Sequence, residues 1–275
     1  MARPLIAASI LDADFSKLGL EVQIVNDAGI DLFTLDVMDG TFVQRITFGD
    51  MVVARVREMT PLPIDVHLMV GDPSSYVEKM WIAGADIITF HIEVVSEQDA
   101  LRLIDKIRSY NLGVGIAVNL ETEIPSIMNL VNHVDLINLM AVSTGYGGQS
   151  LDNRAIDKLT NLRNLFEKEN LDVAVEIDGG VKHSNCSNLF SSGADFVTVG
   201  TGIYHSIDRA SAVKSLIETA ANYSCARPRA IEKILMSRNP VSGRSQRQLD
   251  GLVALRESLD IAPSSWPITG VDSAL

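Results

Sequence analysis

Residues 27–33 (DAGIDLF), 82–88 (IAGADII) and 191–197 (SSGADFV) carry the same arrangement at three places in the chain. In each copy, a stretch that can end a helix is followed by a glycine, an aspartate and an apolar run. Glycine commonly follows the C-terminus of a helix, and short apolar runs bounded by such signals are typical of buried strands. The repeat therefore predicts that helices and strands alternate along the chain.

Further apolar runs recur at the spacing of one strand–helix unit. They are LIAAS (5–9), LFTLD (32–36), IDVHLM (64–69), IITFH (87–91), VGIAVN (114–119), VDLINLM (134–140), VAVEID (173–178) and FVTVG (196–200). Amphipathic stretches between them include 16–29, 73–85, 97–111 and 153–170. Because the runs are continuously apolar, we expect strands that are covered on both faces, as in a parallel sheet.

Eight such units predict a TIM (β/α)8 barrel over residues 1–225. A doubly wound open sheet is the alternative, although no G-x-G-x-x-G follows the first run. Residues 226–275 lack the strand–helix pattern, and we expect a C-terminal extension that is helical near 229–237 and 245–259 and partly mobile. The sequence leaves open whether this extension packs on the barrel or contacts a second subunit.

Composition excludes several classes of protein. The chain has 275 residues and a formal net charge of −12, so it lacks the basic footprint of a nucleic-acid-binding protein. No run approaches the roughly 18 apolar residues of a membrane span, and the N-terminus lacks the pattern of a signal peptide. Cys186 and Cys225 stand apart from any C-x-x-C motif and are expected to be reduced thiols. The sequence predicts a soluble cytoplasmic protein without nucleic-acid or membrane partners.

Chemically active residues follow the predicted strands. The runs end in Ser9, Asp36, His67, His91, Asn119, Met140, Asp178 and Gly200. In a TIM barrel the carboxyl ends of the strands meet at one mouth, where the active site lies. Asp36, His67 and Asp178 are therefore candidates to bind a divalent metal. The two carboxylates could also take a proton from one face of a substrate and return one to the other.

Other polar residues near these strand ends have simpler interpretations. Asp12 and Asp39 are interpreted as helix-capping or turn residues. His91 is interpreted as a strand-end histidine whose hydrogen bonds are satisfied within the protein. Met38 and its counterparts Met69 and Met140 are each ordinary core residues, but together they could form an apolar wall that keeps water from a reactive intermediate.

Glycine-rich turns give a second signal. STGYGGQS (143–150), DGG (178–180) and VGTG (199–202) follow the sixth, seventh and eighth runs. Glycine lets backbone N–H groups approach a ligand closely, and in this fold the loops after strands seven and eight commonly bind phosphate. The turns predict a small phosphorylated substrate whose reacting carbon lies between Asp36 and Asp178.

At this point the sequence resembles the ribulose-phosphate 3-epimerase family. The matching stretches are IAASILDADFSKLG (6–19), LDVMDGTFVQRITFG (35–49), PIDVHLMV (63–70), AGADIITFHIE (83–93), GYGGQS (145–150), VEIDGGV (175–181) and SGADFVTVGTGIY (192–204). They occur in family order over about residues 4–220. The tail beyond about 225 lies outside the resemblance.

The resemblance implies an isomerase of carbohydrate metabolism that inverts C3 of a ketose 5-phosphate through a metal-stabilised enediolate. The default substrate is the pentose phosphate D-ribulose 5-phosphate, and a homo-oligomer is implied. By position, Asp36 and Asp178 match the catalytic pair and, with His67, the metal ligands. The positions that match substrate contacts are Ser9, His67, Met38, Met69, Met140, Gly145, Tyr146, Gly147, Gly148, Asp178, Gly179, Gly180, Gly200 and Thr201.

Thr34 departs from the family pattern, because the resemblance implies a metal-binding histidine at this position. A neutral hydroxyl is a poorer ligand than imidazole for zinc or iron. The expected cofactor is a divalent metal, zinc first with iron, manganese or cobalt as alternatives, held by one protein ligand fewer. Ala8, Gln44–Arg45, Thr201 and the VSTGYGG loop (142–148) also depart. Two alternatives stay open: an epimerase of a different sugar phosphate, or a non-catalytic protein that binds sugar phosphates.

Overall fold

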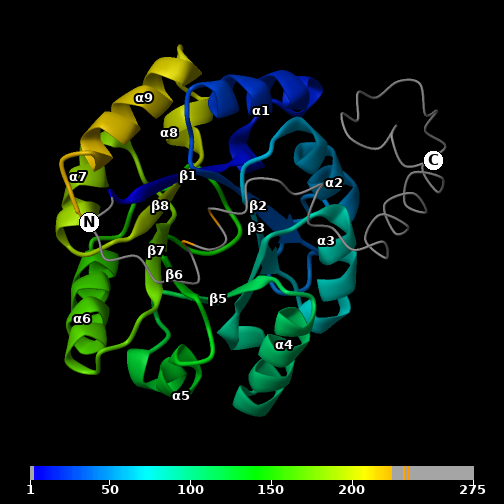
Figure 1. The fold of residues 1–275 in the computed structure, drawn as a ribbon, viewed down its shortest axis with the longest axis vertical. Coiled ribbons are helices and arrows are strands. Elements are labelled where there is room, and N and C mark those ends of the chain that lie inside the picture. Colours follow the sequence, from blue (N-terminus) through cyan, green and yellow to red (C-terminus); the bar gives the residue numbers. More distant parts are fainter. Residues whose placement is uncertain (1–2, 225–231, 233–234, 236–275) are drawn as a thin grey trace.

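Eight parallel strands close into a barrel in the computed structural model, which describes residues 3–224, 232 and 235 (Figure 1). The strands are β1 (Leu5–Ser9), β2 (Leu32–Met38), β3 (Ile64–Met69), β4 (Ile87–His91), β5 (Gly113–Val118), β6 (Leu136–Met140), β7 (Ala174–Asp178) and β8 (Phe196–Val199). Each strand pairs with the next, and β8 pairs with β1. The predicted TIM barrel is confirmed, and this closure rules out the doubly wound sheet.

Helices surround the strands on all sides in Figure 1. They are α1 (Leu18–Asp27), α2 (Asp50–Met59), α3 (Val77–Ala83), α4 (Glu97–Ser109), α5 (Met128–Val131), α6 (Arg154–Lys168), α7 (His183–Ser191), α8 (Thr201–Tyr204) and α9 (Arg209–Ala220). The expected helices at 16–29 and 73–85 begin as short 3-10 turns, Phe15–Lys17 and Pro73–Ser75, before α1 and α3. The carboxyl ends of the strands lead into the connecting loops, where the active site was expected.

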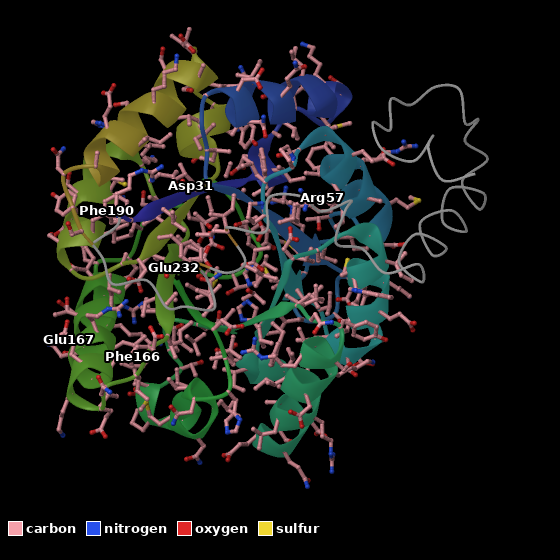
Figure 2. The ribbon with its side chains drawn as sticks, in the orientation of Figure 1. Asp31, Arg57, Phe166, Glu167, Phe190 and Glu232 are labelled. Atoms are coloured by element: carbon pink, nitrogen blue, oxygen red, sulfur yellow. The ribbon has the colours of Figure 1, made fainter. Side chains whose placement is uncertain are left out.

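The repeated aspartate has a structural purpose at the amino ends of the strands. Its carboxylate accepts a hydrogen bond from the backbone N–H of the preceding strand, in the pairs Asp31–Ile6 (2.8 Å), Asp86–Ile64 (2.8 Å), Asp135–Val114 (2.9 Å) and Asp195–Val175 (2.8 Å). An arginine pairs with each carboxylate: Arg3, Arg57, Arg108 and Arg163 respectively. Figure 2 labels Asp31, which pairs with Arg3, and Arg57, which pairs with Asp86. The motif in the opening repeat therefore joins neighbouring strands.

A cluster of buried apolar residues lies at this amino end of the barrel. It consists of Leu5, Ala7, Leu32, Ile87, Leu136, Ala174 and Phe196. Leu235 packs against it, and Leu235 and Glu232 (labelled in Figure 2) are helical. The rest of the predicted helix at 229–237 and all of that at 245–259 lie outside the described residues.

Two expectations from composition can be checked in the described part of the chain. None of its helices has the length and apolarity needed to cross a membrane. Cys186 is a free, buried thiol, and burial raises its pKa to about 12. Cys225 lies outside the described residues.

Candidate active site

Strand register brings together residues that are far apart in sequence. Asp36 on β2 is the register partner of His67 on β3, and Met140 on β6 is that of Asp178 on β7. Since side chains of parallel strands project in layers from such pairs, the polar residues gather at the carboxyl end of the barrel. Ser9 on β1 completes the group, because its hydroxyl donates a 2.6 Å hydrogen bond to Asp36 Oδ2.

Asp36, His67 and Asp178 each offer one ligand atom, and these atoms lie within 4.8 Å of one another. His67 Nδ1 is 3.0 Å from Asp36 Oδ1 and 3.6 Å from Asp178 Oδ2. Two carboxylate oxygens and one imidazole nitrogen suit zinc and other first-row divalent metals, and three protein ligands leave positions open for substrate. The donor set therefore fits a catalytic metal.

Behind His67, a hydrogen-bonded chain fixes the orientation of its ring. His91 Nε2 lies 3.0 Å from His67 Nε2, and His91 Nδ1 lies 3.0 Å from Glu93 Oε2. Burial lowers the pKa of His91 to about 4 despite the neighbouring Glu93 carboxylate. Burial opposes ionisation of Glu93 too, but hydrogen bonds from His91 and from Thr122 and Asn119 lower its pKa to about 2. Neutral His91 therefore donates through Nδ1 and accepts at Nε2.

This assignment determines the protons on His67. Its Nε2–H donates to His91, so Nδ1 faces Asp36 and Asp178. Burial lowers the pKa of His67, but the hydrogen bond to Asp36 and the charge of Asp178 outweigh it and raise the pKa. A proton on Nδ1 is thus held between two carboxyl groups, and a cation bound there would replace that proton.

Thr34 is fully buried and its hydroxyl is engaged away from this group. Its Oγ1 lies 3.1 Å from Thr198 Oγ1, and Thr198 in turn donates to Glu176 Oε1. Because the single hydroxyl proton of Thr198 is donated to Glu176, Thr34 is the donor in its hydrogen bond with Thr198. The departure from the family pattern is therefore absorbed into a polar network inside the barrel.

The predicted substrate-binding residues line one central cavity. These are Ser9, Met38, Met69, Met140, Gly145, Tyr146, Gly147, Gly148, Asp178, Gly179, Gly180, Gly200 and Thr201, together with the catalytic candidate Asp36. His67 lies behind the cavity wall and reaches it through Asp36 and Asp178. Among the glycines, Gly180 is the most constrained: its φ is +68°, and a Cβ built there would lie 2.3 Å from Leu151 N. The structure brings all these residues together, and their chemical roles remain predictions.

Three methionines form apolar surfaces of this cavity. Met38 and Met69 are register partners and cluster with Val43, and Met140 lies beside Asp178. Each is less than 5% exposed. Their side chains supply the apolar wall expected from the sequence.

Sequence reasoning missed several neighbours of the cavity. Leu11, Asp12, Val142, Val181 and Thr198 also line it. Asp39 is the turn residue expected, since its carboxylate accepts hydrogen bonds from Thr41 N and Oγ1.

Asp12 is a turn residue, one of the two interpretations expected, but it is not a helix cap. It lies within the 3-10 turn Ile10–Asp12, whose N-cap is Ser9, and the next turn is capped by Asp14. A Ser-x-x-Asp pattern before a helical segment looks the same whether the aspartate caps a helix or faces a cavity. The sequence alone could therefore not distinguish these two positions for Asp12.

His91 was expected to be a histidine with satisfied hydrogen bonds, and its contacts agree with that. Its connection to His67 could not be read from the sequence, because the two residues meet only across the β3–β4 pair. Asn119, at the end of β5, faces Glu93 and Thr144 and is absent from the cavity lining.

A family model described as the Ribulose-phosphate 3 epimerase family matches residues 5–204. A ribulose-phosphate 3-epimerase from Synechocystis sp. is 37% identical over 208 residues, covering 76% of this chain and 90% of the relative. One from Bacillus subtilis is 35% identical over 212 residues, covering 77% and 97% respectively.

Among solved structures, KGPDC from Streptococcus mutans superimposes with a TM-score of 0.63 at 13% identity, covering 80% of this chain and 99% of that one. At this identity the similarity shows the barrel fold alone.

Proposed function

The chain belongs to the ribulose-phosphate 3-epimerase family, and from that premise we propose that it inverts C3 of a phosphorylated ketose, by default converting D-ribulose 5-phosphate to D-xylulose 5-phosphate. The observation that carries the proposal is the convergence of Asp36 and Asp178 on His67 at the edge of the cavity. Inversion needs one group to remove the C3 proton and another to deliver a proton to the opposite face.

The two carboxyl groups have different surroundings, which divides the roles between them. Burial, with the nearby Asp36 charge, raises the pKa of Asp178 to about 7 in the metal-free site, so Asp178 is the carboxyl group of the pair that takes up a proton more readily. Asp36 receives a hydrogen bond from Ser9 Oγ and, while no cation is bound, another from His67 Nδ1, which hold its oxygens in place as acceptors. Asp36 thus acts as the base toward one face and Asp178 as the acid toward the other, and the roles exchange in the reverse reaction.

Asp36, His67 and Asp178 would hold a divalent cation, for which zinc is the first expectation and iron, manganese or cobalt are alternatives. The cation would supply positive charge that stabilises the enediolate oxygens. The residues themselves place the substrate. The methionines exclude water from the reacting carbon, and the backbone groups of Gly148, Gly180 and Thr201 lie where a distal phosphate can be bound.

Purified full-length chain, supplied with each metal in turn, should produce D-xylulose 5-phosphate from D-ribulose 5-phosphate, measured by NMR of the sugar C3 and C4 protons. Turnover of another ketose phosphate but not of this one would favour the alternative of a different sugar-phosphate substrate. Binding of sugar phosphates without turnover by any metal form would favour a non-catalytic role.

Homo-oligomeric assembly belongs to the same proposal and rests on the family resemblance. Sedimentation of the full-length chain and of a chain ending near residue 225 would measure the assembly and the contribution of the tail to it. A cytoplasmic location remains a prediction from the sequence.

A further inference from the structure

Asp12 lies against the backbone of two glycine turns at the barrel mouth. A Cβ built on Gly147 would be 2.6 Å from Asp12 Oδ1, and one built on Gly200 would be 2.4 Å from Asp12 Oδ2. Both carboxylate oxygens therefore occupy space that only glycine leaves open. These two turns belong to the set from which the sequence predicted a phosphate site.

Asp12 also forms part of the wall between two hollows. The central cavity has a volume of about 60 Å³, and an open cleft of about 670 Å³ lies outside it. Both are lined by Asp12, Gly147, Gly148 and Thr201. Small-molecule pockets run to about 300 Å³ or more, so the central cavity is narrow for a pentose phosphate, and Asp12 is one of the residues that bound it.

The groups that face Asp12 come from several elements. Burial raises the pKa of Asp12, and the charge of Asp36 acts in the same direction. His205, Arg45 and the backbone N–H of Thr201 oppose these effects and stabilise the carboxylate. The carboxylate thus accepts a hydrogen bond from the Thr201 N–H and lies near Arg45 and His205, groups that an incoming anion would also meet.

We propose that Asp12 occupies the position of the substrate's phosphate among these glycines and is a specificity-determining residue that disfavours dianionic substrate ends. The inference rests on the proposed function, because it concerns the distal end of the same substrate. A phosphate group carries a charge of about −1.5 to −2 at neutral pH, and a carboxylate in the same cradle repels it and competes for the backbone N–H of Thr201. A phosphorylated ketose therefore binds only after Asp12 has moved aside.

Asp12→Asn keeps the shape of the side chain and removes its charge, and Asp12→Ser also removes the volume between the glycines. We expect the KM for D-ribulose 5-phosphate to fall about tenfold or more in both variants. The kcat/KM for unphosphorylated D-ribulose should change much less, so the preference for the phosphorylated sugar rises. Asp105→Asn, which removes an exposed acid on α4, is the matched control and should leave both values unchanged.

A binding measurement separates this inference from the proposed activity. Calorimetric titration of inorganic phosphate should show tighter binding to Asp12→Asn and Asp12→Ser than to the unchanged chain or to Asp105→Asn. If no form turns over D-ribulose 5-phosphate, the proposed function fails, but the phosphate titration still tests Asp12. Equal phosphate affinity in the unchanged chain and both Asp12 variants would overturn the inference.

Discussion

His91 Nε2 lies 3.0 Å from His67 Nε2, and this contact links the candidate metal ligand to the carboxylate of Glu93. Because His91 is neutral and accepts at Nε2, His67 presents Nδ1 toward Asp36 and Asp178. A series of hydrogen bonds of this kind selects the tautomer of a metal-binding histidine and holds its ring in place. Residues that bind a metal ligand in this way strongly affect metal affinity. Glu93 is therefore connected to the site although it does not line the cavity.

Glu93→Gln should weaken divalent-metal binding about 10- to 100-fold, because the amide no longer holds His91 with a negative charge. Competition against a chromophoric chelator measures the dissociation constant. Glu97→Gln, an exposed change at the start of α4, is the control. Equal metal affinity in the Glu93 variant and the unchanged protein would show that the hydrogen bonds from Glu93 through His91 do not orient His67.

Metal binding should depend on pH with a defined sign. The raised pKa of His67 and the Asp178 pKa of about 7 mean that the metal-free site carries protons near neutral pH. A cation needs both groups deprotonated, so affinity should rise with pH through about 7 and fall below it. Calorimetry in buffers of different ionisation enthalpy should detect more protons released at pH 6 than at pH 8. Affinity and proton release that stay constant over this range would contradict the assignment.

Restoring a histidine at position 34 should strengthen the metal site. Thr34 is buried against Thr198, so the larger ring needs space, and the test is the double variant Thr34→His with Thr198→Ala. A fourth protein ligand should tighten metal binding about tenfold or more. Thr198→Ala alone serves as the control and should bind metal like the unchanged chain. A correctly folded double variant with unaltered affinity would mean that residue 34 does not reach the metal.

Substitution of Asp135 tests whether the aspartates that join neighbouring strands stabilise the fold. Asp135→Ala removes the acceptor for the buried Val114 N–H and leaves Arg108 without its carboxylate partner. The free energy of unfolding should fall by about 2–4 kcal/mol, measured by urea denaturation. Asp105→Ala on the surface of α4 should change it by no more than about 0.5 kcal/mol. An equally small change in the free energy of unfolding for Asp135→Ala would show that this aspartate does not stabilise the fold.

The sequence was sufficient for the barrel and for much of the cavity, for a physical reason. Continuous apolar runs report burial on both faces, and a closed parallel barrel brings the carboxyl end of every strand to one mouth. Asp36 and Asp178 could therefore be paired from the ends of their runs, although they are far apart in the chain. The helix α7 was harder to predict, because its Ser/Asn-rich sequence has weak helix propensity and buried Cys186, Leu189 and Phe190 anchor it.

The remaining features depend on contacts between side chains that have no sequence period. Glu93 follows β4 in a 3-10 turn and meets His91 only through that turn's geometry. Thr198 looks like any β-branched strand residue, yet it connects Thr34 to Glu176. Asp12 has the pattern of a cap, and only its position against Gly147 and Gly200 distinguishes it.

Proton transfer to and from C3 by the carboxyl groups of Asp36 and Asp178 can be followed by exchange of the C3 proton in heavy water. The metal-loaded chain, incubated with D-ribulose 5-phosphate or D-xylulose 5-phosphate, should replace the C3 proton of each with deuterium and interconvert the two. Asp36→Asn and Asp178→Asn should each exchange the C3 proton of at most one epimer and interconvert neither. If either variant interconverts the two epimers at the unchanged rate, the two-carboxylate account is wrong.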